Sequence, residues 1–307
     1  MPRPGARRGA AEPVEGEALI TTGSARLERD PDAEGGWFVH VNGVPSSYVD
    51  VADPTNLVFE YQQWTAAVLD ALSDPPHPLR AVHLGGAGCA FPRYLAATRP
   101  GSRQLVLEVD ERLADLVRRS FGASGPAGFR LRVADAREGL ARVPDGTQDA
   151  VVRDAFTGDR VPAHLVSVEF LRDVDRVLAP GGVWIANLAD RPPLPHSRAE
   201  AVTARAVFAH VAVLAEPSVL RGRRYGNTLL LASQAPLPVD RLVRVLSGGA
   251  APARLLAGED LDRFAAGSTV VTDAALGLDP PPAPQHPADE PTDEPTDEPT
   301  DEQEPDS

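Results

Sequence analysis

The first elements that the sequence predicts are short runs in which apolar and polar residues alternate. They lie at residues 18–22, 25–28, 37–42 and 47–51. A period of two residues is typical of β-strands with one buried face. Asn42-Gly43 separates two of the runs and favours a tight hairpin turn. The pattern predicts a small antiparallel β module over residues 17–52, preceded by a disordered arm at 1–16 that shows no periodicity.

A helix is predicted next. Asp53-Pro54 resembles a helix cap followed by a proline in the first turn. Apolar residues then recur at helical spacing, at Leu57, Tyr61, Trp64, Val68 and Leu72. We expect a helix that begins near Asp53 and leads into the main domain.

The main domain alternates between strand-like and helix-like segments. Short, largely apolar strands are expected at residues 80–84, 104–108, 130–133, 150–153 and 183–188. Such alternation is typical of a parallel sheet with helices on both faces. Later strands are expected at 210–215 and 227–232, and helices at 198–208 and 239–246. The predicted fold class is α/β, with a Rossmann-like domain over residues 53–279.

Composition changes the picture at the C-terminus. Residues 280–307 repeat Pro-Thr-Asp-Glu and contain ten acidic residues, no Arg or Lys, and no large apolar side chain. This segment cannot build a core, so we expect a disordered acidic tail, either a solvated extension or an interaction segment. Without its ten charges the net charge of −14 becomes −4 for residues 1–279. The charge of the tail argues against a nucleic-acid partner there.

Composition also bears on location and cofactors. No stretch approaches the roughly 18 apolar residues of a membrane span, and no apolar run follows the N-terminal arginines as in a secretory signal. Cys89 is the single cysteine, which excludes an internal disulfide. The histidines are scattered without metal-ligand spacing. We therefore expect a cytoplasmic protein with no metal and no membrane partner.

A candidate ligand site starts at the turn after residues 80–84. Gly85, Gly86 and Gly88 occupy this turn, where glycines let a ligand approach the backbone and the helix amides. The turn alone is also consistent with a tight connection. Glu108 ends the next strand about twenty residues later, where a carboxylate accepts hydrogen bonds from the ribose hydroxyls of an adenine nucleoside.

Further acids follow the next strands. Asp135 can accept a hydrogen bond from an adenine amino group, and it can also cap a helix at 136–142. Asp154 lies at the carboxyl edge of the sheet, where a carboxylate can orient an amine and accept its proton. A loop-capping role is the alternative for Asp154. Asp159, in the same loop, is a weaker candidate for substrate binding.

Several motifs, taken in their order and spacing, resemble the polyamine aminopropyltransferases, the spermidine synthase family. They are GGAGCAFPR, LVLEVDERL, VADAREGL, VVRDAFTGDRVPAHL and LAPGGVWIANL, with further similarity in FEYQQW and RGRRYGNTLLLAS. The similarity covers roughly residues 36–275. It implies a Rossmann-like fold that binds S-adenosylmethionine or its decarboxylated form, and it implies a homodimer.

The resemblance also implies an activity, the transfer of an aminopropyl group from decarboxylated S-adenosylmethionine to a small-molecule amine acceptor. It implies that Glu108 holds the ribose, Asp135 the adenine and Asp154 the attacking amine. Tyr61 and Gln62 match the Tyr-Gln pair that the family places near its amine site.

Two departures from the family pattern keep other functions open. Gly88 stands where the family has an Asp, and Thr157 stands where it has the second acid of Asp-x-x-Asp. Those acids hold two cationic substrates together against their repulsion. The alternatives are a methyltransferase that uses intact S-adenosylmethionine and a nucleoside-binding homologue without catalysis.

Overall fold

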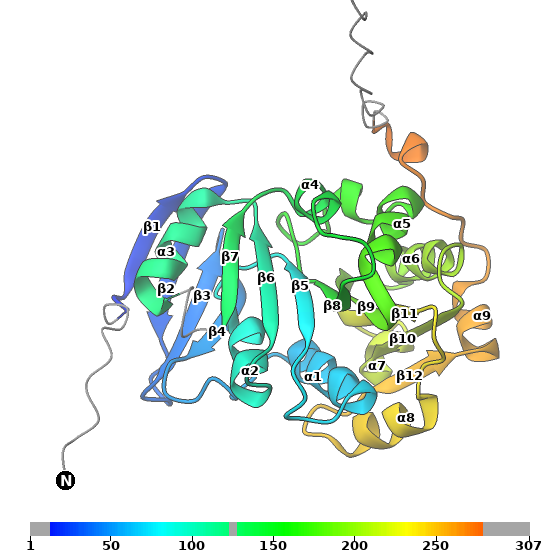
Figure 1. The fold of residues 1–307 in the computed structure, drawn as a ribbon, viewed down its shortest axis with the longest axis horizontal. Helices are drawn as coiled ribbons and strands as arrows, with labels where there is room; N and C mark the ends of the chain where they lie inside the picture. Colours follow the sequence, from blue (N-terminus) through cyan, green and yellow to red (C-terminus); the bar gives the residue numbers. More distant parts are fainter. Residues whose placement is uncertain (1–12, 123–127, 279–307) are drawn as a thin grey trace, which may run out of the picture.

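The smaller of two sheets is built from the N-terminal strands. The computed structural model describes residues 13–122 and 128–278, so the predicted tail and most of the predicted arm lie outside the described residues. Strands β1 (Gly16–Ile20), β2 (Gly23–Arg29), β3 (Gly36–Val41) and β4 (Val44–Asp50) pair antiparallel in this order (Figure 1). Asn42 and Gly43 join β3 to β4 with φ angles of 52° and 80°, as a type I′ turn requires. The predicted hairpin is confirmed.

The larger sheet has eight strands and is mixed. Its strands are β5 (Arg80–Leu84), β6 (Arg103–Glu108), β7 (Phe129–Val133), β8 (Gln148–Arg153), β9 (Leu178–Asp190), β10 (His210–Ala215), β11 (Gly226–Ser233) and β12 (Arg254–Ala257). They lie in the order β12-β10-β11-β9-β8-β5-β6-β7 (Figure 1). The five strands predicted to be parallel, β5 to β9, are parallel. This confirms the α/β Rossmann-like class.

The remaining strands form an antiparallel edge. β11 pairs antiparallel with β9 and β10, and β12 pairs antiparallel with β10. Between β10 and β11 the chain contains only the four-residue helix α7 (Pro217–Leu220), which is too short for the crossover that a parallel pair needs. Two edge elements, β12 and the helix α9 (Glu259–Ala265), were not predicted from the sequence.

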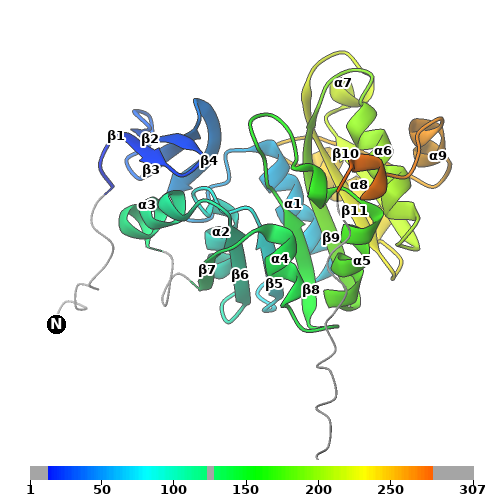
Figure 2. The same cartoon turned by 90° about the horizontal axis from the view of Figure 1, so that it is seen from above.

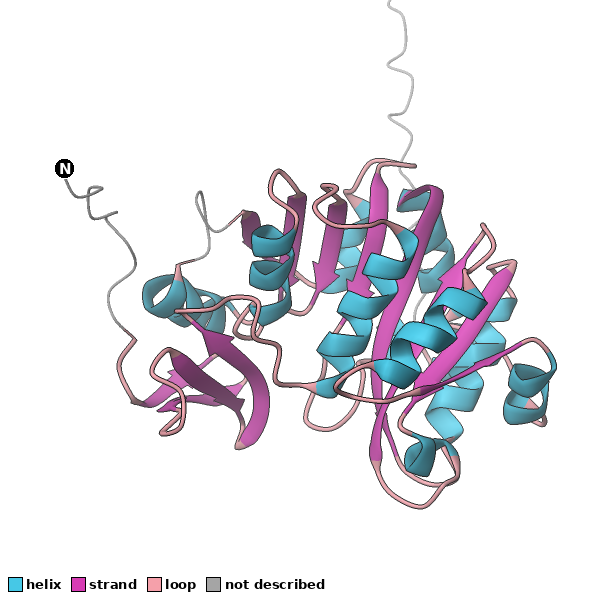
Figure 3. Ribbon diagram, turned by 90° about the horizontal axis from the view of Figure 1, so that it is seen from below, coloured by secondary structure: helices cyan, strands magenta, loops and turns pink. Residues whose placement is uncertain are grey.

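Helices cover both faces of the larger sheet (Figures 2 and 3). Residues of α1 (Glu60–Leu72), α2 (Ala90–Thr98) and α8 (Val239–Gly248) share one apolar core with the strands. Residues of α4 (Ala136–Ala141), α5 (Val168–Val177), α6 (Pro195–Arg205) and α9 share the core on the opposite face. Within residues 13–122 and 128–278, no helix is both long and apolar enough to cross a membrane.

Helix α3 (Glu111–Phe121) connects the larger sheet to the N-terminal sheet. Its buried side chains share a third core cluster with residues of β1 to β4 and of β6. Asp110 caps α3 by accepting from the Leu113 amide at 2.8 Å. The same carboxylate accepts from the amides of Thr21 and Thr22 in the β1–β2 turn, at 3.0 and 2.7 Å. A single acid therefore fixes the N-terminal sheet against the helix that follows β6.

Helix α1 begins later than predicted. Its first residue is Glu60, and the carboxylate of Asp53 instead accepts from the amide and hydroxyl of Thr55 at 2.9 and 2.6 Å. This local turn satisfies Asp53 without a helix, because short acidic side chains stabilise turns and helix caps by the same kind of hydrogen bond. The prediction of a cap at Asp53 is therefore wrong, although the apolar face of α1 lies where the spacing places it.

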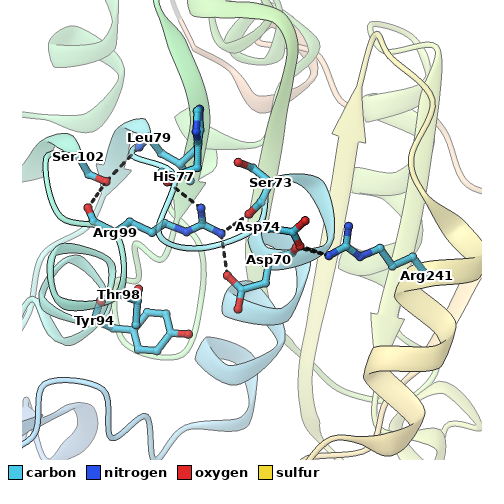
Figure 4. A network of polar contacts seen from close by, with 10 residues as sticks. All are labelled: Asp70, Ser73, Asp74, His77, Leu79, Tyr94, Thr98, Arg99, Ser102 and Arg241. Atoms are coloured by element: carbon cyan, nitrogen blue, oxygen red, sulfur yellow. Dashed lines mark hydrogen bonds and ion pairs between the residues drawn. The ribbon is translucent and has the colours of Figure 1, made fainter.

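A buried arginine holds the end of α2 against the end of α1. Arg99 is fully buried, and it donates to the His77 carbonyl at 2.8 Å and to the Asp70 carboxylate at 2.7 Å (Figure 4). It also donates to the Ser73 carbonyl. His77 and Ser73 lie in the connection between α1 and β5, the central strand of the parallel region. The network therefore holds this connection in place.

Candidate active site

One pocket lies at the carboxyl ends of the parallel strands, the edge at which open α/β sheets bind ligands. The turn after β5 and the ends of β8 and β9 form its floor, while α1, α2 and β4 supply its walls. It is lined by Ser46, Ser47, Tyr61, Gln62, Thr65, His83, Gly85, Gly86, Ala87, Ala90, Phe91, Pro92, Val152, Asp154, Asn187 and Leu229. The structure thus brings Tyr61, Gln62, Gly85, Gly86 and Asp154 together, as the sequence predicts for a common site.

Asp154 is held by a chain of polar side chains from three elements. Its Oδ2 accepts from the Tyr61 hydroxyl of α1 at 2.8 Å, and its Oδ1 accepts from the Asn187 amide of β9 at 2.9 Å. Asn187 in turn accepts from the Asn227 side chain of β11 at 2.9 Å. These bonds fix the plane of the carboxylate and leave each oxygen further capacity to accept.

The surroundings of Asp154 shift two pKa values. Burial raises the pKa of Asp154, and the bonds from Asn187 and Tyr61 offset part of this rise by stabilising the carboxylate. Burial, with the charge of Asp154 beside it, raises the pKa of Tyr61 well above the ordinary value. Tyr61 therefore stays a hydroxyl donor at physiological pH.

Arg153, the residue before Asp154 in the chain, points away from the pocket. The Arg153 guanidinium lies on the opposite face, over the Trp184 ring and against the Glu200 carboxylate at 2.7 Å. Arg153 and Glu200 are both buried, so each charge is satisfied by the other. Among the described residues that line the pocket, none is an arginine.

Glu108 supports the glycine turn. Its Oε2 accepts from the amides of Gly86 and Ala87 at 2.9 and 3.2 Å, and its Oε1 accepts from the Asp110 amide at 3.0 Å. A carboxylate offers about four acceptor positions, so room for a further donor is left. The side chain is nevertheless 9% exposed and does not line the pocket itself.

Glycine is required at position 85, and position 86 leaves little room for a side chain. A Cβ on Gly85, which has a φ of 98°, would lie 2.2 Å from the Asp154 carbonyl oxygen, and one on Gly86 would lie 3.2 Å from Glu108 Oε2. A Cβ on Gly88 would meet Ser47 Oγ and Val49 Cγ2 of β4 at 2.8 Å. The N-terminal sheet thus occupies the space that a side chain at position 88 would need.

Asp135 has the cap role that the sequence allowed for it. Its Oδ1 accepts from the amides of Arg137 and Glu138 at 2.9 and 3.1 Å. Its Oδ2 lies 2.7 Å from His164 Nε2. Burial acts to raise the pKa of Asp135, but the bond from His164 and the two amides lower it overall. Asp135 lies after β7 and is not among the residues that line the pocket.

The structure does not bring Asp159 to the pocket. This side chain is exposed and pairs with Arg191 at 3.1 Å, and Arg191 lies over the Tyr225 ring. Thr157 also lies outside the lining residues, in the same exposed loop. The described residues contain no group of three or more His, Cys, Asp or Glu side chains placed to hold a metal ion.

Sequence reasoning missed three polar residues of the site. Asn187 and Asn227 occur in the motifs LAPGGVWIANL and RGRRYGNTLLLAS, but no local pattern separates them from ordinary strand residues. His83 is one of the scattered histidines, which show no metal-ligand spacing. The sheet register is the signal that groups these residues, because Asn187 continues the row of Asp154 across β8 and β9.

Comparison with known proteins agrees with this arrangement. No protein-family model matches the chain. A polyamine aminopropyltransferase of Vibrio vulnificus is 29% identical over 193 residues, which are 62% of this chain and 61% of that protein. A polyamine aminopropyltransferase of Chromobacterium violaceum is 26% identical over 141 residues, which are 46% of this chain and 53% of that protein. The chain thus matches about three fifths or less of the length of these curated relatives.

Solved structures match over more of the chain. The crystal structure of a probable spermidine synthase from Corynebacterium glutamicum has 34% sequence identity and a TM-score of 0.79, and the match covers 88% of this chain and all of that one. Spermidine synthase from Thermotoga maritima has 15% identity and a TM-score of 0.55, covering 86% and 87% of the two chains, and supports the fold alone.

The fold and the pocket define a Rossmann-like α/β protein with a ligand site at the carboxyl edge of its parallel strands. Within this class the relatives agree on one group. The chain belongs to the spermidine synthase family, of which it is a divergent member.

Proposed function

We propose that the protein transfers an aminopropyl group from decarboxylated S-adenosylmethionine to a small amine. The observation that supports this proposal best is the charge of the pocket. Asp154 is the one acid among the described residues that line the pocket, and none of those residues is an arginine. An aminopropyl sulfonium and an amine are both cationic, so a carboxylate favours their joint binding.

The same observation weighs against intact S-adenosylmethionine. Its additional carboxylate would lie near Asp154, and the described residues that line the pocket include no arginine to balance it. At about 4 Å such a pair of like charges costs about 1 to 4 kcal/mol, depending on how wet the site is. Asp154 alone therefore disfavours the intact form, without acids at positions 88 and 157.

The proposed step is a displacement at carbon. The bound ammonium group first loses a proton, which frees the lone pair of its nitrogen. We assign Asp154 to orient the amine and accept this proton, with Tyr61 and Asn187 keeping its carboxylate in place. The neutral nitrogen then attacks the aminopropyl methylene carbon bonded to sulfur. A carbon–nitrogen bond forms, the carbon–sulfur bond breaks with its electron pair on sulfur, and neutral methylthioadenosine leaves while the positive charge moves to the nitrogen of the product.

The nucleoside part would bind along the ends of β5, β6 and β7. Gly85 and Gly86 leave the backbone of the turn accessible, and Glu108 has acceptor capacity for a ribose hydroxyl. Asp135 would receive the adenine amino group on an oxygen that His164 also contacts. Each of these assignments rests on position and hydrogen-bonding capacity.

Product analysis tests the proposal. The purified protein is incubated with an aliphatic diamine and either decarboxylated or intact S-adenosylmethionine, and the products are identified by mass spectrometry. We expect aminopropylated diamine and methylthioadenosine with the decarboxylated form alone. A methylated acceptor formed from the intact form would replace the proposal with methyl transfer, and binding of methylthioadenosine without any product would point to the non-catalytic alternative.

A further inference from the structure

Five exposed arginines lie on three loops at the carboxyl edge of the parallel strands. Two of the loops follow β8 and β9, and the third precedes β11, which starts beside the end of β9 because the two strands are antiparallel. None of these arginines lines the pocket. We call the group the arginine surface, and it consists of Arg160, Arg191, Arg221, Arg223 and Arg224.

Contacts between the loops make this one continuous surface. Arg191 pairs with Asp159 of the loop after β8 at 3.1 Å, and its guanidinium lies 5.2 Å from the centre of the Tyr225 ring, just before β11. A Cβ on Gly222 would lie 3.8 Å from the Cβ of Pro192, which is van der Waals contact. The arginines of all three loops therefore share one region at the rim of the pocket.

The arginine surface has an excess of positive charge. Two acids pair with it, since Asp159 contacts Arg191 and Glu216 contacts Arg224. Five arginines and these two acids leave a net charge of +3. A surface of this charge attracts an anionic partner. The arginines that have no acidic partner among the described residues are Arg160, Arg221 and Arg223.

The chain itself contains a segment of complementary charge. Residues 280–307 contain ten acidic residues and no Arg or Lys. They also contain no large apolar side chain that could be buried in a groove, so any docking of this acidic tail must depend on charge. The charged surface and the charged segment thus suit each other in the kind of contact that each can make.

The described chain ends on the same side of the molecule as the arginine surface. The Asp273 carboxylate accepts from both terminal nitrogens of Arg137, at 2.9 and 2.7 Å. Arg137 is in the first turn of α4, directly after β7, and therefore at the carboxyl edge of the sheet. Leu140 of α4 and Leu194, which follows the loop after β9, belong to the same core cluster. The acidic tail therefore starts at the edge and on the face where the arginine surface lies.

The length of the chain is sufficient for the contact. From β7 to β11 there are five steps between neighbouring strands, about 24 Å at about 4.8 Å for each step. Asp289, the first acid of the tail, is 16 residues beyond Asp273. Extended chain spans about 3.3 Å for each residue, which gives Asp289 a reach of about 50 Å. The acids that follow it reach further.

We propose that residues 280–307 dock on the arginine surface of their own chain, held by ion pairs between the acids of the tail and the arginines. This inference goes beyond the proposed function and does not depend on it, because none of the five arginines lines the pocket. Ten acids against a net charge of +3 change the rim from positive to negative. A negative rim favours the approach of cationic molecules, and a positive rim opposes it.

Arginine footprinting on the full-length protein tests the proposal. Phenylglyoxal modifies accessible guanidinium groups, and mass spectrometry of peptides gives the rate at each arginine. The wild type is compared with a full-length variant in which the ten acids of residues 280–307 are replaced by Asn and Gln. Exposed arginines remote from the surface, Arg103 and Arg119, are the internal standards. Melting temperatures verify that the variant folds.

Protection of Arg221 and Arg223 is the expected result. Exposed ion pairs are weak singly, but several of them on a tethered segment act together, so both arginines should react about three-fold or more slowly in the wild type than in the variant, relative to the standards. The wild type alone gives a second measurement that needs no variant. In 1 M NaCl, where the screening length is about 3 Å, the protection should disappear.

Three other outcomes overturn the proposal. Equal rates in the wild type and the variant, with no effect of salt, show that the tail does not dock on the arginine surface. Protection that grows with protein concentration shows that the tail of a second copy occupies the surface. Protection that the variant retains and that nuclease treatment removes assigns the surface to nucleic acid.

Discussion

Replacing Asp154 by asparagine is the most direct test of the proposed chemistry. Asn has the shape of Asp but neither its charge nor its basicity. Its amide oxygen can still accept from Asn187, which donates to Asp154 at 2.9 Å. Its NH₂ group would face the Tyr61 hydroxyl, which now donates to Asp154 at 2.8 Å and would have to turn its proton away. The local packing is kept, and the acceptor for the amine proton is lost.

The expected effects differ in size. Loss of a positioned general base typically lowers the rate by about 10² to 10⁴, so kcat should fall by this factor. Binding of methylthioadenosine should change little, because Asp154 is not assigned to the nucleoside. Stability should change by about 1 kcal/mol or less, since the weakened bond to Tyr61 is offset by the easier burial of a neutral group.

The pH profile gives an independent check. Burial raises the pKa of Asp154, despite the opposing bonds from Asn187 and Tyr61. The carboxylate is the active form and is lost as the pH falls through this raised pKa. The acidic limb of the wild-type rate should therefore begin at a higher pH than for an ordinary aspartate, and the residual activity of Asp154→Asn should lack this limb.

The assay follows release of methylthioadenosine with decarboxylated S-adenosylmethionine and diamine. Asp159→Asn is a matched control, because Asp159 lies in the same loop but is exposed and paired with Arg191. It should keep the wild-type rate. An Asp154→Asn protein that retained more than about a tenth of wild-type kcat would refute the assignment of Asp154 as the base, since a general base contributes at least about 10².

Three further predictions concern binding and stability. Glu108→Gln should weaken methylthioadenosine binding about ten-fold or more in calorimetry, because charge-assisted bonds that hold the glycine turn are lost, whereas the exposed Glu111→Gln should not. Gly88→Asp should lower the free energy of unfolding by about 1 to 3 kcal/mol in urea titrations, because its Cβ would crowd β4; unchanged stability would show that β4 yields. Arg99→Ala should cost about 2 to 4 kcal/mol in the same titrations, with exposed Arg103→Ala near zero; equal costs would contradict the importance of the network.

Features with local causes could be predicted from the sequence. The Asn42-Gly43 turn depends on two residues that tolerate positive φ, and Asp110 caps the helix that begins one residue later. The parallel strands could be predicted because their apolar runs are separated by helical segments. The helix cap predicted at Asp53 is wrong, because the Asp53 carboxylate accepts a hydrogen bond from the Thr55 amide in a turn. Local hydrogen-bond chemistry is shared by turns and caps, so the sequence could not choose between them.

The composition of the site was decided by the tertiary structure. Asp154 could be identified from its place after a strand, but its partners Tyr61 and Asn187 are distant in sequence and meet it only because α1 packs over β8 and β9. His83 is an isolated histidine in the sequence, and only the strand register places it in the same pocket as Asp154. The sequence alone determined which residue types follow each strand. Which of them face one pocket depended on strand order and register, which are set by packing between segments far apart in the chain.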